Sequence, residues 1–307
     1  YYSLQMLHLN IRSIDVLRLQ LTETTNIEQR LPIYKQFMLH SGGDFRTLTA
    51  AYMQKLLNLF MNSHQLPEFT LLGVGSLAHQ DDIDVGVLDD GSESRKELNM
   101  IIHYLSREMF KWATELHFYL TEHVGTQFYT ASIQEFKELL DKEIQDFIII
   151  TEMINAVPIL GSHRLYKKFL HEITFRYHYQ HRGNNRFHEA YLRGILGEIR
   201  SFLFRKINQN KLNAKDDALR MISGVIFSGK TIFRIHRGNR WEILQALMRK
   251  DPSRKHLYSE LEKALSFLEI FRQVYQLFVG LEEDIYLDNP GIVDNLQTVA
   301  QTLGYND

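Results

Sequence analysis

The chain has 307 residues, of which 44% are hydrophobic and 23% are charged, as in an ordinary globular protein. Its 35 Lys and Arg residues nearly balance 37 Asp and Glu residues, and the net charge of −2 gives no electrostatic support for a nucleic-acid-binding protein. Cysteine is absent, which excludes disulfide frameworks, thiolate zinc sites and cysteine nucleophiles.

The hydrophobic residues are not expected to form a membrane anchor. The longest aliphatic run, Ile148 to Ile150, is far shorter than the ~20 apolar residues of a membrane span. The first residues, Tyr1 to Leu4, lack the basic stretch followed by an apolar stretch that marks a signal peptide. We therefore expect a cytoplasmic protein with no membrane partner, and the length predicts two subdomains or one large one.

Residues 1–66 are expected to form an N-terminal helical segment. Apolar residues recur there at intervals of three and four, which is the period of an amphipathic helix. They are Leu4, Leu7, Ile11, Ile14 and Leu17 in the first part, and Leu48, Tyr52, Leu56 and Leu59 in the second. Gly42-Gly43-Asp44 lies between the two parts.

Residues 67–130 have a different pattern, which is typical of a small α/β core. Phe69 to Val74 is a short extended run, and Ile83 to Leu88 is predicted to be a second strand. A helix is predicted over 92–112, followed by a strand over 114–122 in which apolar and polar residues alternate. Two strands, a helix and a third strand in so short a stretch predict a sheet of mixed pairing.

Residues 131–307 are predicted to be entirely helical. They contain two apolar stripes at helical spacing, and the charged residues between them are expected to be solvated helix faces. The first stripe is Ile133, Phe136, Leu140, Ile144, Phe147 and Ile154, and the second is Leu257, Leu261, Leu265, Leu268, Phe271 and Tyr275. The predicted fold class is therefore α+β, with a small mixed-sheet core between an N-terminal helical arm and a larger all-helical C-terminal domain.

The segment 72–88 carries the residues with the clearest chemical meaning. A strand leads into Gly75-Ser76, and the chain returns as Asp82-x-Asp84 on the next strand. Gly75 allows the backbone to approach a phosphate closely, and Ser76 offers an N–H and a hydroxyl to the same anion. Alternate strand residues share a face, so Asp82 and Asp84 are expected to point the same way and to bind Mg²⁺ beside the phosphates. Two such ions would neutralise a triphosphate, activate an attacking hydroxyl and stabilise departing pyrophosphate.

These residues resemble the signature of the DNA-polymerase-β-like nucleotidyltransferase superfamily, in which Gly-Ser precedes Asp-x-Asp in a hydrophobic strand. Parts of the chain that follow are similar to the nucleotidyltransferase half of the bacterial uridylyltransferases that modify the nitrogen-signalling protein PII, and of related nucleotidyltransferases. The similar segments are 130–136, 148–152, 159–169 and 293–307. The resemblance implies a nucleoside triphosphate substrate, a two-metal Mg²⁺ site and transfer of a nucleoside monophosphate to an acceptor hydroxyl. It also implies a role in signal transduction, with a protein as one candidate acceptor.

The resemblance implies further site residues. A third carboxylate is expected on the strand over 114–122, where Glu115 is the best candidate and His117 is the alternative if the strand register differs. Arg164 and Lys168 lie where the family has a helix that lines the nucleotide cleft. They are expected to bind the triphosphate, and a solvated helix face is the equal alternative.

Two departures from the family pattern leave a second function open. Only five residues separate Ser76 from Asp82, a shorter spacer than the family usually has. The family's Gly-Pro-Gly-Gly-Leu-Arg-Asp segment is represented by 194–201, in which Gly197 and Arg200 are retained. The alternative function is a nucleotide-sensing regulatory module that binds a nucleotide without transferring it.

Gly224 to Thr231 matches the letters of the phosphate-binding loop of P-loop ATPases. The residues before it have helical spacing, whereas a P-loop follows an aliphatic strand, and Val225-Ile226-Phe227 would fill the loop with bulky side chains. We therefore expect a boundary between a helix and a turn, and a P-loop ATPase is the least favoured function. The histidines at positions 171, 178, 181 and 188 are likewise expected to form a polar face rather than a metal site.

Overall fold

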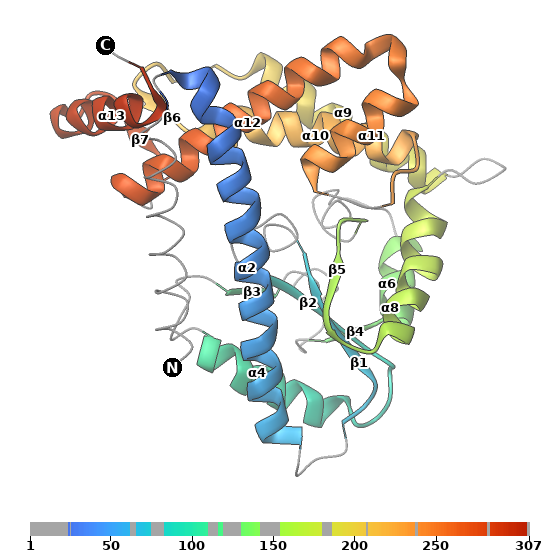
Figure 1. Ribbon diagram of the computed structural model, residues 1–307. Helices are drawn as coiled ribbons and strands as arrows, with labels where there is room; N and C mark the ends of the chain where they lie inside the picture. Colours follow the sequence, from blue (N-terminus) through green and yellow to red (C-terminus); the bar gives the residue numbers. More distant parts are fainter. Residues whose placement is uncertain are drawn as a thin grey trace. The chain divides into compact units, whose positions relative to one another are not determined.

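A computed structural model describes most of the chain (Figure 1). The described residues are 24, 26–61, 66–74, 83–109, 116–118, 130–141, 154–179, 186–206, 208–236, 239–280 and 283–305. They fall into two compact units. The first comprises the described residues of Gly42–Gly194, and the second those of Leu7–Ser41 and Ile195–Asp307.

The first unit contains a small mixed sheet. Its strands are β1 (Phe69–Gly73), β2 (Ile83–Asp89), β3 (Leu116–Phe118), β4 (Ala131–Ser132) and β5 (Val157–Gly161). The order is β3-β2-β1-β5, in which β1 pairs antiparallel with both neighbours and β2 pairs parallel with β3. The short β4 also pairs parallel with β2, next to its last two residues, so β3 and β4 share one edge of β2. The fold is therefore a mixed α+β structure.

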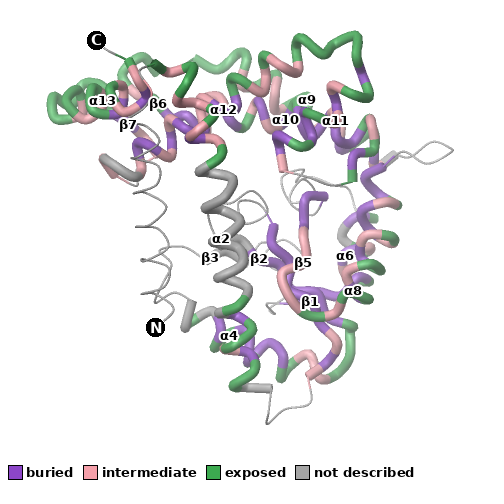
Figure 2. The backbone as a smooth tube through the Cα atoms, viewed as in Figure 1, coloured by how far each residue is buried: buried purple, intermediate pink, exposed green. Residues whose placement is uncertain are grey.

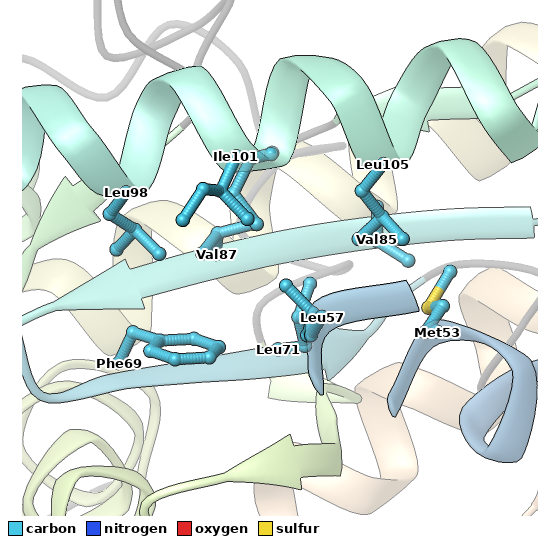
Figure 3. Close-up of a cluster of buried hydrophobic side chains, with 10 residues drawn as sticks. Met53, Leu57, Phe69, Leu71, Val85, Val87, Leu98, Ile101 and Leu105 are labelled. Carbon is cyan, nitrogen blue, oxygen red and sulfur yellow. The ribbon is translucent and has the colours of Figure 1, made fainter. Parts of the chain in front are cut away.

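One face of this sheet is covered by apolar side chains from two helices. Figure 3 shows Val85 and Val87 of β2 between the helix α4 (Arg95–Met109) and the last turns of α2 (Ile27–Met61). The alternation of a strand sends every second side chain to this face, and α4 places apolar residues on one side at helical spacing. The buried residues of this cluster are Met53, Leu57, Phe69, Leu71, Val85, Val87, Leu98, Ile101, Ile102 and Leu105.

The opposite face of the sheet is also covered. Leu72 and Leu88 have the other strand parity and are fully buried. The helix α8 (His163–Phe169) contacts both β1 and β2, and α6 (Ile133–Asp141) contacts β4. The helix η1 (Leu170–His178), which is wound as a π-helix, follows α8 directly and packs on α6.

The second unit is mainly helical (Figure 2). Its elements, apart from the first part of α2, are the end of α9 (Arg186–Phe204), β6 (Lys211–Leu212), η2 (Lys215–Leu219), α10 (Arg220–Ile232), α11 (Arg240–Lys250), η3 (Pro252–Arg254), α12 (Lys255–Phe278), β7 (Ile285–Tyr286) and α13 (Pro290–Leu303). One apolar cluster joins α2, α12, β7 and α13, and its buried members are Tyr34, Ile270, Val274, Tyr275, Ile285, Val299 and Leu303.

Two buried arginines of the second unit are paired with carboxylates. Arg240 Nη2 lies 2.5 Å from Glu269 Oε1, and these side chains are only 10% and 3% exposed. Arg272 donates from Nε to Glu283 Oε1 at 2.8 Å. Pairing is what makes burial of such groups tolerable, because an isolated charge would lose its hydration without compensation.

The structure confirms several predicted elements and corrects others. The strands at 69–73 and 83–89, the helix at 95–109 and the helix at 255–278 lie where the sequence places them. The prediction that 131–307 is entirely helical is wrong, because β4 and β5 extend the sheet and β6 pairs with β7. None of the helices in the part of the chain described above is long and apolar enough to cross a membrane.

The long helix α2 also differs in detail from its prediction. It continues through Gly42 and Gly43 without interruption. Its predicted apolar stripe included Leu59, which is 68% exposed, whereas Met53 and Leu57 are buried. The helical face that packs on the sheet is therefore rotated from the one inferred from spacing alone.

Candidate functional site

Most of the candidate site lies in segments that the structure does not describe. Gly75, Ser76 and Asp82 belong to the connection between β1 and β2, and Glu115 directly precedes β3; all four are outside the described residues. Asp84 is described through its backbone, as the second residue of β2. The strands around Asp84 are therefore the part of this site that the structure describes.

The first feature of that frame is the hairpin of β1 and β2. Gly73, the last residue of β1, pairs with Val85, one residue after Asp84. The undescribed residues 75–82 therefore connect two neighbouring strand ends. A connection of this kind keeps the Gly75-Ser76 pair and the Asp82-x-Asp84 pair within one short stretch of chain.

The second feature is the position of Asp84 within the sheet. The strand β2 lies between β1 and β3, and Val85 and Val87 belong to the apolar cluster under α4. Because strand residues alternate between faces, position 84 belongs to the face opposite α4. An interior strand of the sheet thus carries an acidic residue close to its first residue.

The third feature is the register of the neighbouring parallel strand. Asp84 is the Cα partner of His117, with Ile83 opposite Leu116 and Val85 opposite Phe118. Partner positions of paired strands lie on the same face of a sheet. The residue of β3 that is aligned with Asp84 is therefore His117, whereas the predicted third ligand, Glu115, lies two positions earlier and outside the described residues.

The other end of β2 is fixed by a cluster of charged side chains that sequence reasoning missed. Asp89, which is 1% exposed, accepts hydrogen bonds from Arg95 Nε at 2.5 Å and from Arg95 Nη2 at 2.9 Å. Arg95 also donates from Nη1 to Glu135 Oε1 at 2.8 Å. The guanidinium therefore joins the end of β2, the start of α4 and the start of α6.

Glu135 has a second role at the start of α6. The Ser132 backbone N–H donates to Glu135 Oε2 at 2.7 Å, and the Glu135 N–H donates to Ser132 Oγ at 3.3 Å, which is a capping box. Burial by itself would raise the pKa of the Glu135 carboxyl, but the hydrogen bonds from Arg95 and Ser132 outweigh it and hold this pKa below its ordinary value. The Ser-x-x-Glu spacing was the sequence signal that could have identified this helix start.

Arg164, a predicted nucleotide ligand, lies in an ion pair in the structure. Its Nε donates to Glu68 Oε1 at 3.1 Å, its Nη2 also donates to Glu68, and its side chain is 85% exposed. Hydrogen bonds from Arg164 and Ser162 lower the pKa of the Glu68 carboxyl. Glu68 precedes β1 whereas Gly75 follows it, and a five-residue strand spans roughly 16 Å. The structure thus places Arg164 beside the start of β1, whereas Gly75 and Ser76 follow its other end.

Lys168 lies one turn further along α8. Its Nζ is 4.0 Å from Glu172 Oε1, and its side chain is 59% exposed. Glu172 also accepts a hydrogen bond from Lys137, which is the first cause of the lowered pKa of the Glu172 carboxyl. Lys168 therefore belongs to an acidic and basic surface group on α8, α6 and η1, and it pairs with a different carboxylate from Arg164 although the two residues lie one turn apart on α8.

The Walker-like letters form no loop. Gly224 to Thr231 lies inside α10, and the hydroxyls of Ser228 and Thr231 donate to the Gly224 and Phe227 carbonyls at 2.8 and 2.9 Å. Lys230, which would hold phosphates in a P-loop, is 2% exposed, and burial lowers its pKa to about 7. The rejection of a P-loop here is confirmed, because the segment forms the last turns of α10, which ends at Ile232 and is followed by a turn.

The histidine-rich segment also has a structural arrangement where it is described. His178 and His188 are buried, and His188 Nδ1 lies 2.9 Å from the His178 carbonyl oxygen. His181 lies outside the described residues. Among the described histidines of this set, His171 is exposed as predicted, whereas His178 and His188 are not part of an exposed face. The ring of His178 packs against Tyr191.

Among the side chains that the structure describes, no group of three His, Asp or Glu residues is placed to hold a metal ion. The predicted ligands are not in that set, so Asp82 and Asp84 stay a prediction. No protein-family model matches this chain, and a comparison with the curated proteins finds no significant match.

Proposed function

We propose that this protein is a nucleotidyltransferase that moves a nucleoside monophosphate from a nucleoside triphosphate to an acceptor hydroxyl. The observation that carries the proposal is the position of Asp84 on the interior strand β2, at the end that the chain enters after the segment with Gly75 and Ser76. An antiparallel β1 on one side and a parallel β3 on the other give Asp84 two neighbouring strands from which further site residues can be presented.

Residue chemistry supports Asp82 and Asp84 as the metal ligands. Mg²⁺ takes oxygen ligands and is bound in proteins by one or two carboxylates together with substrate phosphates and water. Position 84 belongs to the sheet face opposite the apolar cluster under α4, which is the face on which a carboxylate is not forced into that cluster. The bound metal would stabilise negative charge on the phosphates.

The reaction would then follow from the groups that the chain supplies. The acceptor hydroxyl attacks the α-phosphorus, the bond from that phosphorus to the bridging oxygen breaks, and pyrophosphate leaves with the oxygen. The hydroxyl proton passes to a base, for which Glu115 and His117 are the two candidates. Gly75 and Ser76 would hold the phosphates through backbone and hydroxyl donors. Arg164 contributes nothing to this argument, because its guanidinium is paired with Glu68.

The test is transfer of label from each of the four nucleoside triphosphates, α-labelled, with Mg²⁺ and candidate acceptor proteins. Wild-type protein should transfer label, and Asp84→Asn, which keeps the side-chain volume but removes the charge, should lose at least about a hundredfold in rate. Glu93→Gln is the matched control, because Glu93 is an exposed carboxylate in the loop after β2. Full activity of Asp84→Asn would refute the proposal.

The same assay separates the enzyme from the nucleotide-sensing module. Saturable nucleotide binding without transfer to any acceptor would favour the sensor, since the ligand would then be held but not consumed. The pH dependence of transfer in Glu115→Gln and His117→Asn shows which of the two residues is the base. The variant that removes the base should lose the rise of rate with pH, and the other should keep it.

A further inference from the structure

Two helices carry the chain from one compact unit to the other. The helix α2 changes unit between Ser41 and Gly42, and the helix α9 changes unit between Gly194 and Ile195. Among the described elements, no other helix or strand contributes residues to both units. Each of the two helices therefore has glycine at the point of change, Gly42-Gly43 in α2 and Gly194 in α9.

The first turns of α2 are fixed to helices of the second unit. Arg30 donates from Nη1 to the Thr302 carbonyl of α13 at 2.8 Å, and the Tyr34 hydroxyl donates to the same oxygen at 2.7 Å. Lys35 donates from Nζ to Glu262 Oε1 of α12 at 2.6 Å. Tyr34 is also buried in the apolar cluster of α12, β7 and α13. These contacts hold the start of α2 in the second unit.

The last turns of α2 are fixed in the other unit. Met53 and Leu57 are 1% and 0% exposed and belong to the apolar cluster of β1, β2 and α4 (Figure 3). Leu56 packs against the same cluster. The pair Gly42-Gly43 therefore lies between two parts of one helix that are held in two separate cores.

The helix α9 is likewise held on both sides of Gly194. Before this glycine, the ring of the buried Tyr191 packs on His178 of η1, with 5.7 Å between the ring centroids. After it, the buried Ile195 packs on α10, since a Cβ added at Gly224 would lie 3.5 Å from Ile195 Cγ2. Because η1 belongs to the first unit and α10 to the second, Gly194 also separates two anchored parts of one helix.

Glycine weakens a helix at the position where it stands. In a helix interior it costs about 1 kcal/mol relative to alanine, because its backbone is not restricted by a side chain. Sharp helix kinks form at few kinds of position, one of which is a Gly/Ser pair, and Ser41 directly precedes Gly42-Gly43. A hinge consists of a few residues that absorb changes of φ and ψ between rigid parts. The glycines of α2 and α9 stand where such residues are needed.

We propose that Gly42-Gly43 and Gly194 are the two joints of a hinge about which the two units change their orientation. Because α2 and α9 are anchored on both sides of their glycines, a rotation of one unit bends both helices, and each helix bends where it is weakest. The proposal concerns the connection between the units and does not depend on the proposed transfer reaction.

The experiment measures distances between the units by pulsed electron paramagnetic resonance. The chain has no cysteine, so introduced cysteines are the only attachment points for spin labels. Lys96→Cys on α4 and Gln297→Cys on α13 place one label at an exposed position of each unit. Lys96→Cys with Lys167→Cys on α8 is the reference, because both labels then belong to the first unit. The distance distribution between the units should be at least about twice as wide as that of the reference.

Alanine at the joints should narrow the distribution between the units. Gly42→Ala/Gly43→Ala and, separately, Gly194→Ala should each reduce its width by about half, since alanine stiffens the helix. Gly197→Ala is the matched control, because Gly197 lies one turn further along α9, within the second unit, and nothing lies within 4 Å of the added Cβ. It should leave the width unchanged. If circular dichroism shows a loss of helix in Gly194→Ala, the α2 variant decides by itself.

Three results would overturn the hinge. The first is a distribution between the units that is as narrow as the reference, which would mean that the units do not move. The second is an unchanged width in Gly42→Ala/Gly43→Ala, which would mean that the movement does not use these glycines. The third is an equal narrowing in Gly197→Ala, which would mean that any added helix propensity has the same effect.

Discussion

Arg95 holds Asp89 through two hydrogen bonds, from Nε to Oδ2 at 2.5 Å and from Nη2 to Oδ1 at 2.9 Å. The Asp89 side chain is fully buried and that of Arg95 is 14% exposed, so water screens this pair weakly. Asp89 ends the strand on which Asp84 is the second residue. The pair therefore fixes the far end of the strand that carries the candidate metal ligand.

Arg95→Met should destabilise the protein by about 3 kcal/mol, because it leaves the Asp89 carboxylate buried without its partner. Urea unfolding measures the change. Arg107→Met is the control on the same helix, since Arg107 is exposed, and its effect should stay within about 0.5 kcal/mol. Equal effects of the two substitutions would show that the pair of Arg95 and Asp89 does not stabilise the protein more than an exposed arginine does.

Gly161→Ala should destabilise the protein by roughly 2 kcal/mol or more, through strain at a left-handed position and a backbone collision. Gly161 has φ of 100°, and a Cβ there would lie 2.5 Å from the Phe69 carbonyl oxygen. The comparison is Gly197→Ala in α9, where nothing lies within 4 Å of the added atom. That substitution should stabilise the helix by about 0.5–1 kcal/mol. Thermal unfolding of the two variants should therefore shift in opposite directions.

Because Lys230 is buried, the free energy of unfolding should increase as the pH rises above 7. An unfolded lysine keeps its proton up to about pH 10.4, whereas burial lowers the pKa of Lys230 to about 7. Between these values the unfolded state binds more protons, so the free energy of unfolding increases with pH. Lys230→Met should remove this increase and stabilise the protein at pH 7, on the order of 3 kcal/mol.

Urea unfolding at several pH values between about 7 and 9.5 checks this prediction. Lys255→Met is the control, because Lys255 is exposed at the start of α12. An unchanged pH slope in Lys230→Met would contradict a depressed pKa for this lysine.

The ion pair of Glu68 and Arg164 should appear as a lowered pKa when the Glu68 carboxyl is titrated. Hydrogen bonds from Arg164 and Ser162 lower the pKa of Glu68, so the stability that Glu68 contributes is present above its unfolded pKa and is lost as the pH falls through its folded pKa. In Arg164→Ala the pKa of Glu68 should rise toward its ordinary value, as measured by NMR. A Glu68 titration that is unchanged in Arg164→Ala would mean that the pair does not form in solution and would return Arg164 to the nucleotide-binding hypothesis.

The hairpin could be predicted because its sequence pattern and its packing agree. Val85 and Val87 alternate with Asp84 and Gly86, and the structure buries the two valines under α4. The edge strand β5 could not be recognised by alternation, because Val157-Pro158-Ile159-Leu160 is a short continuous apolar run that also fits the inside of a helix. Pro158 was the available signal, since proline is disfavoured in a helix interior and tolerated at a sheet edge.

The candidate site was predictable only in part for a related reason. Alternation along the chain assigns Asp84 to a face, but the residue beside it on the next strand depends on register, which tertiary packing sets. The structure aligns His117 with Asp84 in β3. The contact of Arg95 with Asp89 and Glu135 likewise joins residues up to 40 positions apart, and no local pattern reports it.

Proline at the sheet edge has one more consequence. Within the described part of the chain, the strand order leaves one side of β5 without a partner in the sheet, and at Pro158 the backbone has no N–H to donate. The register of β5 against β1 is also interrupted between Leu71 and Leu72. A foreign strand that approached this side would therefore meet a strand of irregular register, which is a poor template for regular pairing. The edge is thereby protected against strand-to-strand aggregation between molecules.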